Sequence, residues 1–258
     1  MLTTLRKLYL TQQSMKQKPT NHTAFTLIEL LVVISIIAIL AGIALPVFGE
    51  VKIRGDQTKA LSNAKQIGTA CKIYAQDFNG SYPQYTDIAA KTEAKTGAYA
   101  NDVLSTLIPD YLPEKSIFAI GKSKYCSKAG SADATTAANI NKLGPAENEW
   151  AYVVGLTDTS YSRWPLLASG FKPGTTPPVY DTDDTKPGGI WKGKKAIVIR
   201  CDGSGNVESL KKSDKSVKRN PDEPDATAKN AFADGASDTP AWFTFSDSLF
   251  VAHATESK

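Results

Sequence analysis

The chain has 258 residues, of which 22% are charged and 41% are hydrophobic, an ordinary composition for a protein that folds around a hydrophobic core. Its net charge of +4 equals the charge of residues 1–24, which contain four basic residues and no acidic one: Arg6, Lys7, Lys16 and Lys18. The remaining residues therefore sum to zero, and we expect no nucleic acid among the partners.

The first element is an apolar run of 20 residues, 30–49, without a charged side chain. A helix of that length spans roughly 30 Å, the thickness of the hydrocarbon core of a bilayer. Because basic flanks stay in the cytoplasm, the run predicts one membrane-spanning helix with the C-terminal body on the far side. A cleaved secretory signal fits less well, since the run is too long and Ala44-Leu45-Pro46 is a poor cleavage site. A plain uncleaved anchor remains an alternative.

Glu29 lies at the start of this apolar segment, where an unpaired carboxylate costs a few kcal/mol and implies a partner. The surrounding residues, from Ala24-Phe25-Thr26 to Val33-Ile34, resemble the prepilin cleavage and methylation signature of type IV pilins and type II secretion pseudopilins. The resemblance implies that a prepilin peptidase cuts between Ala24 and Phe25 and that Phe25 becomes the N-methylated first residue. Ala24 stands where the family usually has glycine, and both residues are small.

The resemblance also implies how copies assemble. Glu29 of one subunit would pair with the new amine of Phe25 on a neighbour inside an apolar filament core, because a paired buried charge is penalised much less than a lone one. Gly42 and Pro46 mark a stretch of weak helix that bends or melts. The implied partners are other copies and other pilin-like subunits, the prepilin peptidase, an inner-membrane assembly platform and membrane lipid.

The helix is predicted to continue beyond the membrane to about Phe78, where Asn79-Gly80 ends it. Six residues at steps of three and four define one buried face: Ala60, Ala64, Ile67, Cys71, Tyr74 and Phe78. We therefore expect three parts: a basic leader that is removed, 1–24, a long helix, 25–79, and a globular domain, 80–258.

The globular domain is predicted to be an antiparallel β-sheet packed on the long helix, an α+β fold. Its Asp202-Gly203 turn and the segment 107–113 resemble parts of the large pilin-like proteins of environmental bacteria. The expected elements are a short helix over 101–110, strands over 150–156 and 196–201, a turn over 202–205, a returning strand over 206–210, a long exposed loop over 211–240 and a last strand over 242–252.

Residues that carry out chemistry are scarce. The chain has two histidines, His22 in the leader and His253 near the C-terminus, so we expect neither a Ser-His-Asp site nor a histidine metal cluster, and no enzyme. The one candidate cofactor is calcium, because some pseudopilins hold it in a loop near the C-terminus. Its ligands here would be Asp181, Asp183 and Asp184, although these residues also suit a solvated acidic loop.

Three cysteines leave two alternatives open. If the domain lies outside the cytoplasm, one disulfide is expected, with Cys126–Cys201 as the first choice and Cys71 left over. Otherwise all three thiols are reduced and packed as small apolar residues.

The predicted function is that of a structural subunit that polymerises through its N-terminal helix into a type IV pilus or a type II secretion-like pseudopilus. It would span the inner membrane once, with its C-terminal domain in the periplasm, and the filament would lie in the periplasm or at the cell surface. The alternative is a membrane-tethered carbohydrate-binding or adhesion module, suggested by the four tryptophans Trp150, Trp164, Trp191 and Trp242. The sequence does not separate a pilus from a secretion pseudopilus, or a major from a minor subunit.

Overall fold

A computed structural model describes the chain in two units, residues 1–50 and 51–258. The described residues are 26–84, 100–124, 126, 142–144, 147–172, 175, 177–233 and, for the backbone alone, 249–251.

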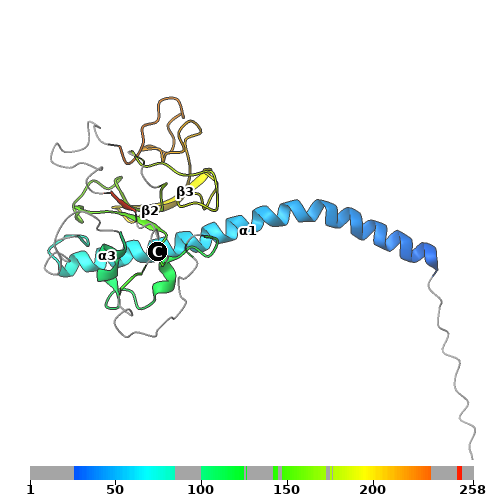
Figure 1. Ribbon diagram of the computed structural model, residues 1–258, viewed down its shortest axis with the longest axis horizontal. Helices are drawn as coiled ribbons and strands as arrows, with labels where there is room; N and C mark the ends of the chain where they lie inside the picture. The colour runs from blue at the N-terminus through cyan, green and yellow to red at the C-terminus, as the bar shows by residue number, and fades with distance from the viewer. Residues whose placement is uncertain are drawn as a thin grey trace, which may run out of the picture. The chain divides into compact units, whose positions relative to one another are not determined.

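Helix α1 (Leu27–Asp77) is the longest element, with 51 residues, and it confirms the predicted long helix (Figure 1). In the first unit it is continuous through Gly42 and Pro46. Pro46 has no backbone N–H to donate, so the helix loses one hydrogen bond there without ending.

In the second unit, α1 buries one face, as its period of three and four residues predicts. The buried side includes Ala60, Ala64, Ile67, Cys71 and Tyr74. Phe78, the last member of the predicted stripe, is instead 43% exposed and stacks on the ring of Tyr74 at a centroid distance of 4.0 Å. The helix terminates there because Asn79 and Gly80 adopt positive φ angles, as expected for a helix C-terminus.

The sheet has five antiparallel strands in the order β4-β3-β2-β1-β5, which confirms the α+β class. Its strands are β1 (Trp150–Val153), β2 (Pro165–Ser169), β3 (Lys195–Arg200), β4 (Gly205–Ser209) and β5 (Leu249–Val251). Strands β1 and β2 are buried along their whole length and β3 is nearly so, whereas β4, at one end of the order, contains buried, half-buried and exposed residues. Strands covered on both faces read as continuous apolar runs, whereas a strand at the edge of a sheet is partly open to solvent.

The predicted hairpin between β3 and β4 is confirmed. In its turn Gly203 has φ +86°, and its N–H donates to the carbonyl of Arg200 over 2.8 Å. The Asp202 side chain accepts a 2.7 Å hydrogen bond from the N–H of Ser204. Asp202 is therefore used to close the turn.

Helix α1 lies directly on this sheet. A methyl group built on Gly68 would come within 2.8 Å of Cγ2 of Ile199 in β3. With Ala64 and Ala60 preceding it on the buried face, Gly68 forms a smooth strip that lets the helix approach the strand closely.

Two of the predicted elements differ from the structure, and two observed elements were not predicted. The expected helix over 101–110 is divided into α3 (Ala100–Leu104) and the 3-10 turn η1 (Ser105–Leu107), and a second 3-10 turn, η2 (Lys115–Phe118), was not expected. Strand β2 was missed, since it is short and begins with a proline. Of the expected last strand over 242–252, β5 takes residues 249–251, and residues 242–248 lie outside the described residues.

The predicted exposed loop over 211–240 is confirmed in its described part, residues 211–233, which contains no named helix or strand and is mostly exposed or half-buried. A few of its side chains are buried, among them Val217, Ala231 and Phe232, and Phe232 packs edge-to-face on Phe171 at 4.7 Å. A long segment without regular structure thus attaches to the core through a few side chains far apart in sequence.

Candidate functional site

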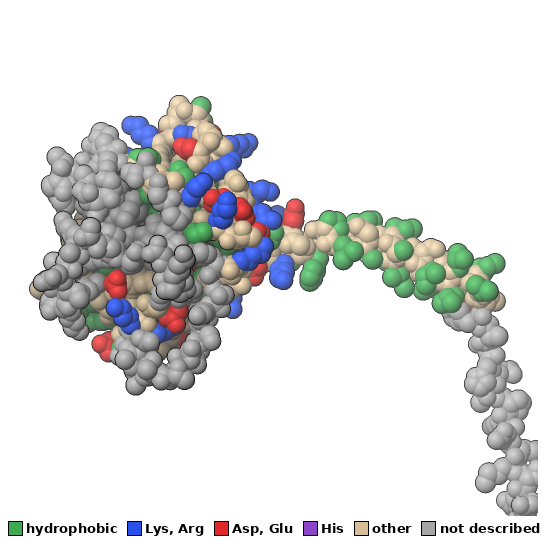
Figure 2. All heavy atoms as spheres, in the orientation of Figure 1, with side chains coloured by type: hydrophobic (Ala, Val, Ile, Leu, Met, Phe, Trp, Pro, Cys, Tyr) green, Lys and Arg blue, Asp and Glu red, His purple; other side chains and the backbone are tan. Residues whose placement is uncertain are grey.

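The first part of α1 exposes a long apolar surface. Among the described residues of the first unit, every side chain is exposed, with values from 45% at Val33 to 81% at Leu27 for the large hydrophobic ones. Figure 2 shows hydrophobic side chains along this helix. By length and composition, α1 is able to cross a membrane. A helix that is apolar all round needs lipid or other helices to cover it.

Glu29 and Thr26 form a reciprocal cap at the beginning of α1. Oε2 of Glu29 accepts hydrogen bonds from the backbone N–H and the hydroxyl of Thr26, each over 2.8 Å. In return, the N–H of Glu29 donates to the hydroxyl oxygen of Thr26 over 3.2 Å. This is a capping box, in which Thr26 is the N-cap and Glu29 the third helical residue. The sequence pattern Thr-x-x-Glu before an apolar run is the local signal for such a cap.

The cap holds the carboxylate of Glu29 against the backbone N–H of Thr26, one residue after the predicted new N-terminus. The N–H of Thr26 belongs to the peptide that joins it to Phe25, so Oε2 lies 2.8 Å from the first nitrogen after that residue. Both bonds from Thr26 end on Oε2, so Oε1 can accept a hydrogen bond from a further donor. The predicted cleavage residues Ala24 and Phe25 themselves lie outside the described residues.

Gly42 and Pro46, the other predicted assembly residues, lie on the exposed apolar stretch of α1. A methyl group at Gly42 would meet nothing within 4 Å. The space around Gly42 is therefore open to a neighbouring helix, and its role in assembly stays a prediction.

The predicted calcium ligands do not converge. The described residues contain no group of three acidic, cysteine or histidine side chains arranged to hold a metal ion. Asp181 accepts from the N–H of Asp183 and Asp183 accepts from Thr185, and these bonds hold the pKa of both carboxyls below their usual value. All three carboxylates also face lysines, in the pairs Asp181–Lys172, Asp183–Lys186, Asp184–Lys124 and Asp184–Lys192 at 3.0–3.8 Å. Ammonium groups occupy the positions that a cation would need, so the arrangement does not fit calcium.

The predicted disulfide between Cys126 and Cys201 is not formed. All three cysteines are free and buried. Cys201 follows β3, where its carbonyl accepts from the hydroxyl of Tyr82, whereas Cys126 donates its N–H to the hydroxyl of Ser123. Burial raises the pKa of the Cys71 and Cys201 thiols to about 12. The structure agrees with the other predicted alternative, in which all three thiols are reduced and packed as small apolar residues.

The tryptophans do not form an exposed aromatic surface in the described residues. Trp150, Trp164 and Trp191 are at most 7% exposed, and Trp242 lies outside the described residues. They serve as core residues, which removes the observation that suggested a tryptophan-lined sugar site.

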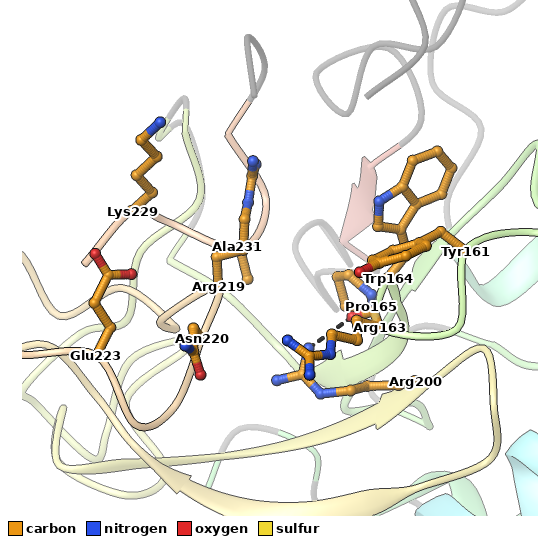
Figure 3. A pocket seen from close by; sticks show the side chains of 10 residues that line it. All are labelled: Tyr161, Arg163, Trp164, Pro165, Arg200, Arg219, Asn220, Glu223, Lys229 and Ala231. Atoms are coloured by element: carbon orange, nitrogen blue, oxygen red, sulfur yellow. Dashed lines mark hydrogen bonds between the residues drawn. The ribbon is translucent and has the colours of Figure 1, made fainter. Parts of the chain in front are cut away.

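A pocket that the sequence analysis missed lies in the second unit, with a volume of about 440 Å³. Figure 3 shows Tyr161 and Trp164 on one side, Arg219 and Lys229 on the other, and Arg200 between them. Its remaining lining residues are Arg163, Pro165, Asn220, Glu223 and Ala231. No sequence motif joins these positions, because they come from three segments that only the fold brings together.

Comparisons with known proteins bear on the N-terminal region. Residues 20–45 match the family model of the prokaryotic N-terminal methylation motif. The chain is similar to the type IV major pilin protein PilA of Myxococcus xanthus (strain DK1622), with 43% identity over 69 residues. That match spans 27% of this chain and 30% of the relative's length. No solved structure matches the chain. The N-terminal region, which joins the methylation motif to a long apolar helix, is therefore similar to that of a type IV major pilin.

Proposed function

We propose that the chain is a structural subunit that polymerises through α1 into a type IV pilus or a type II secretion-like pseudopilus. The methylation motif and the similarity to a major pilin support a pilin-type subunit. One structural observation supports the proposal: an uncovered apolar helix begins with a carboxylate that is hydrogen-bonded to Thr26, the residue after the predicted new N-terminus. The subunit acts by assembly and makes or breaks no covalent bond itself.

Before assembly, the subunit would lie in the inner membrane, with residues 1–24 in the cytoplasm and the globular domain in the periplasm. A prepilin peptidase would remove the leader between Ala24 and Phe25. The assembly platform would then move the helix from lipid into the filament, where neighbouring helices replace lipid around its apolar surface.

Glu29 favours this transfer electrostatically. A carboxylate at the edge of the apolar segment is costly in lipid, and the two hydrogen bonds from Thr26 offset only part of that cost. In the filament, Oε1 of Glu29 would accept a hydrogen bond from the ammonium group of Phe25 in a neighbouring subunit, while Oε2 keeps its bonds to Thr26. The ion pair forms in one axial register, which sets the position of each subunit against the next.

The capping box allows the charge of Glu29 to be tested apart from its hydrogen bonds. Glutamine also suits the third position of a capping box, so Glu29→Gln keeps the cap and removes the charge. We expect Glu29→Gln to be processed normally, with mass spectrometry showing methylated Phe25, and to yield few or no filaments when coexpressed with a peptidase and platform.

The matched control is Glu50→Gln, which removes a carboxylate from an exposed position of the same helix. It should leave filament yield unchanged. Filaments at wild-type yield from Glu29→Gln would refute the ion-pair mechanism, and a native chain that still begins at Met1 would refute the proposed processing.

A further inference from the structure

We propose that the pocket lined by Tyr161, Arg163, Arg200, Arg219 and Lys229, here called the arginine pocket, binds an acidic sugar unit of an anionic polysaccharide. The pocket lies wholly in the second unit, so its binding requires no polymerisation and is independent of the proposed assembly function. Four basic side chains and one acidic side chain, Glu223, line it.

Arg200 provides a fixed base for this pocket. Its Nη2 lies 2.6 Å from Oε1 of Glu208, and its Nη1 donates to the backbone carbonyl of Arg163 over 2.7 Å. The guanidinium is thereby held in one orientation, and its charge is balanced by Glu208. Arg200 therefore shapes the pocket, while the excess positive charge comes from the other basic residues.

Arg163 and Lys229 supply that excess charge. Both side chains are exposed, and neither forms an ion pair within the described residues. They come from opposite walls, as Figure 3 shows. An oxyanion between these walls would receive charge-assisted hydrogen bonds from a guanidinium on one side and an ammonium group on the other.

The aromatic wall gives the pocket an apolar face beside its charges. Tyr161 is 50% exposed, and its ring is held edge-to-face against Trp164 at 6.3 Å and 65°. The segment is fixed further, because the N–H of Cys201 donates to the carbonyl of Trp164 over 2.9 Å. A rigid, half-exposed ring next to cationic groups matches a ligand with one flat apolar face and an anionic substituent, such as the ring of a sugar acid.

The size and charge distribution favour a sugar over a nucleic acid. A volume of about 440 Å³ is within the usual range for small-ligand pockets. Nucleic-acid binding depends on many phosphate contacts along a basic surface, whereas the chain after residue 24 has a net charge of zero and gathers cations locally in this pocket.

The experiment measures binding of the full-length chain in detergent to polygalacturonate, dextran sulfate and neutral dextran by calorimetry. Binding to either anionic polysaccharide, and none to dextran, is expected, and the two anionic arms separate carboxylate from sulfate as the preferred group. Arg163→Gln/Lys229→Gln should weaken binding by about tenfold or more. The control, Lys59→Gln/Lys194→Gln, removes the same charge from exposed positions away from the pocket and should bind as wild type.

Two further variants test the aromatic and acidic walls. Tyr161→Ala should lose affinity and Tyr161→Phe should keep it, because only the ring is used. Glu223→Gln should bind severalfold tighter, because it removes the one acidic side chain from the lining. If the double variant Arg163→Gln/Lys229→Gln melts at a lower temperature than wild type, the comparison of Tyr161→Ala with Tyr161→Phe tests the binding site instead.

Three results would overturn the proposal. If the pocket variant and its control lose the same binding affinity, the polysaccharide is attracted by the overall positive charge of the chain and not by the pocket. Binding of poly-glutamate as tight as polygalacturonate, and insensitive to Tyr161→Ala, would indicate an acidic peptide. Tighter binding of single-stranded DNA would indicate a nucleic acid. None of these results affects the filament assay of Glu29→Gln, so the two proposals fail separately.

Discussion

Arg200 and Glu208 form an ion pair across the β3–β4 hairpin, with Nη2 and Oε1 2.6 Å apart and side chains only 8% and 4% exposed. Within the described residues, the second carboxylate oxygen of Glu208 is buried without a hydrogen-bond partner. Burial raises the pKa of Glu208, and the charge of Arg200 opposes that rise. The stability of the folded domain therefore depends on the presence of both Arg200 and Glu208.

Removing one member of this pair should destabilise the domain strongly. Arg200→Leu leaves the carboxylate of Glu208 buried and unpaired, so we expect a loss of about 3–5 kcal/mol in unfolding free energy. The double variant Arg200→Leu/Glu208→Leu should recover most of this loss, since no buried charge remains. Urea unfolding followed by tryptophan fluorescence measures both. A loss below about 1 kcal/mol in the single variant would show that water reaches Glu208.

Glu149 should make stability depend on pH. It is 5% exposed, and burial raises its pKa to about 7, although the hydroxyl of Ser123 donates to it over 2.7 Å. The pKa of Glu149 is higher in the folded protein than in the unfolded chain. The contribution of its protonated carboxyl to folding stability is therefore full below about pH 4.5 and is lost as the pH rises through 7.

Glu149→Gln keeps the shape and removes this titration. At pH 8 the variant should be more stable than wild type by on the order of 3 kcal/mol, and at pH 4 the two should be similar. Denaturant unfolding at both pH values makes the comparison. Parallel pH profiles for the two proteins would contradict the raised pKa.

The three thiols should be present but unreactive in the native protein. Cys71 and Cys201 are buried, and their thiols have pKa values of about 12, so little thiolate is present at pH 8. We expect almost no labelling by N-ethylmaleimide in the folded chain and three labels per chain in denaturant without reductant, counted by mass spectrometry. One label per denatured chain would reveal a disulfide.

The contact between α1 and β3 gives a matched pair of glycine substitutions. Gly68→Ala places a methyl group 2.8 Å from Cγ2 of Ile199, which has little room to move, so we expect a loss of about 1–3 kcal/mol. Gly55→Ala, in the same helix with nothing within 4 Å, should gain up to about 1 kcal/mol. Thermal melting of the full-length chain reports both. A neutral Gly68→Ala would mean that the helix does not lie this close to the strand.

Features that depend on neighbouring residues could be predicted from the sequence alone. The apolar run 30–49, the helix end at Asn79-Gly80 and the Asp202-Gly203 hairpin are each set by local periodicity or by turn residues. The residues of the methylation motif are also contiguous, so the motif can be recognised without a structure. Even the capping box of Thr26 and Glu29 was available in the pattern Thr-x-x-Glu.

Contacts between distant segments could not be predicted in this way. The fold buried Phe232 against Phe171, paired Asp184 of the predicted calcium loop with Lys124, and left Cys126 and Cys201 unbonded. It also brought Arg163, Arg200 and Lys229 to one pocket. Long-range contacts like these arise from side-chain packing and charge pairing in three dimensions, for which residue spacing along the chain contains no signal.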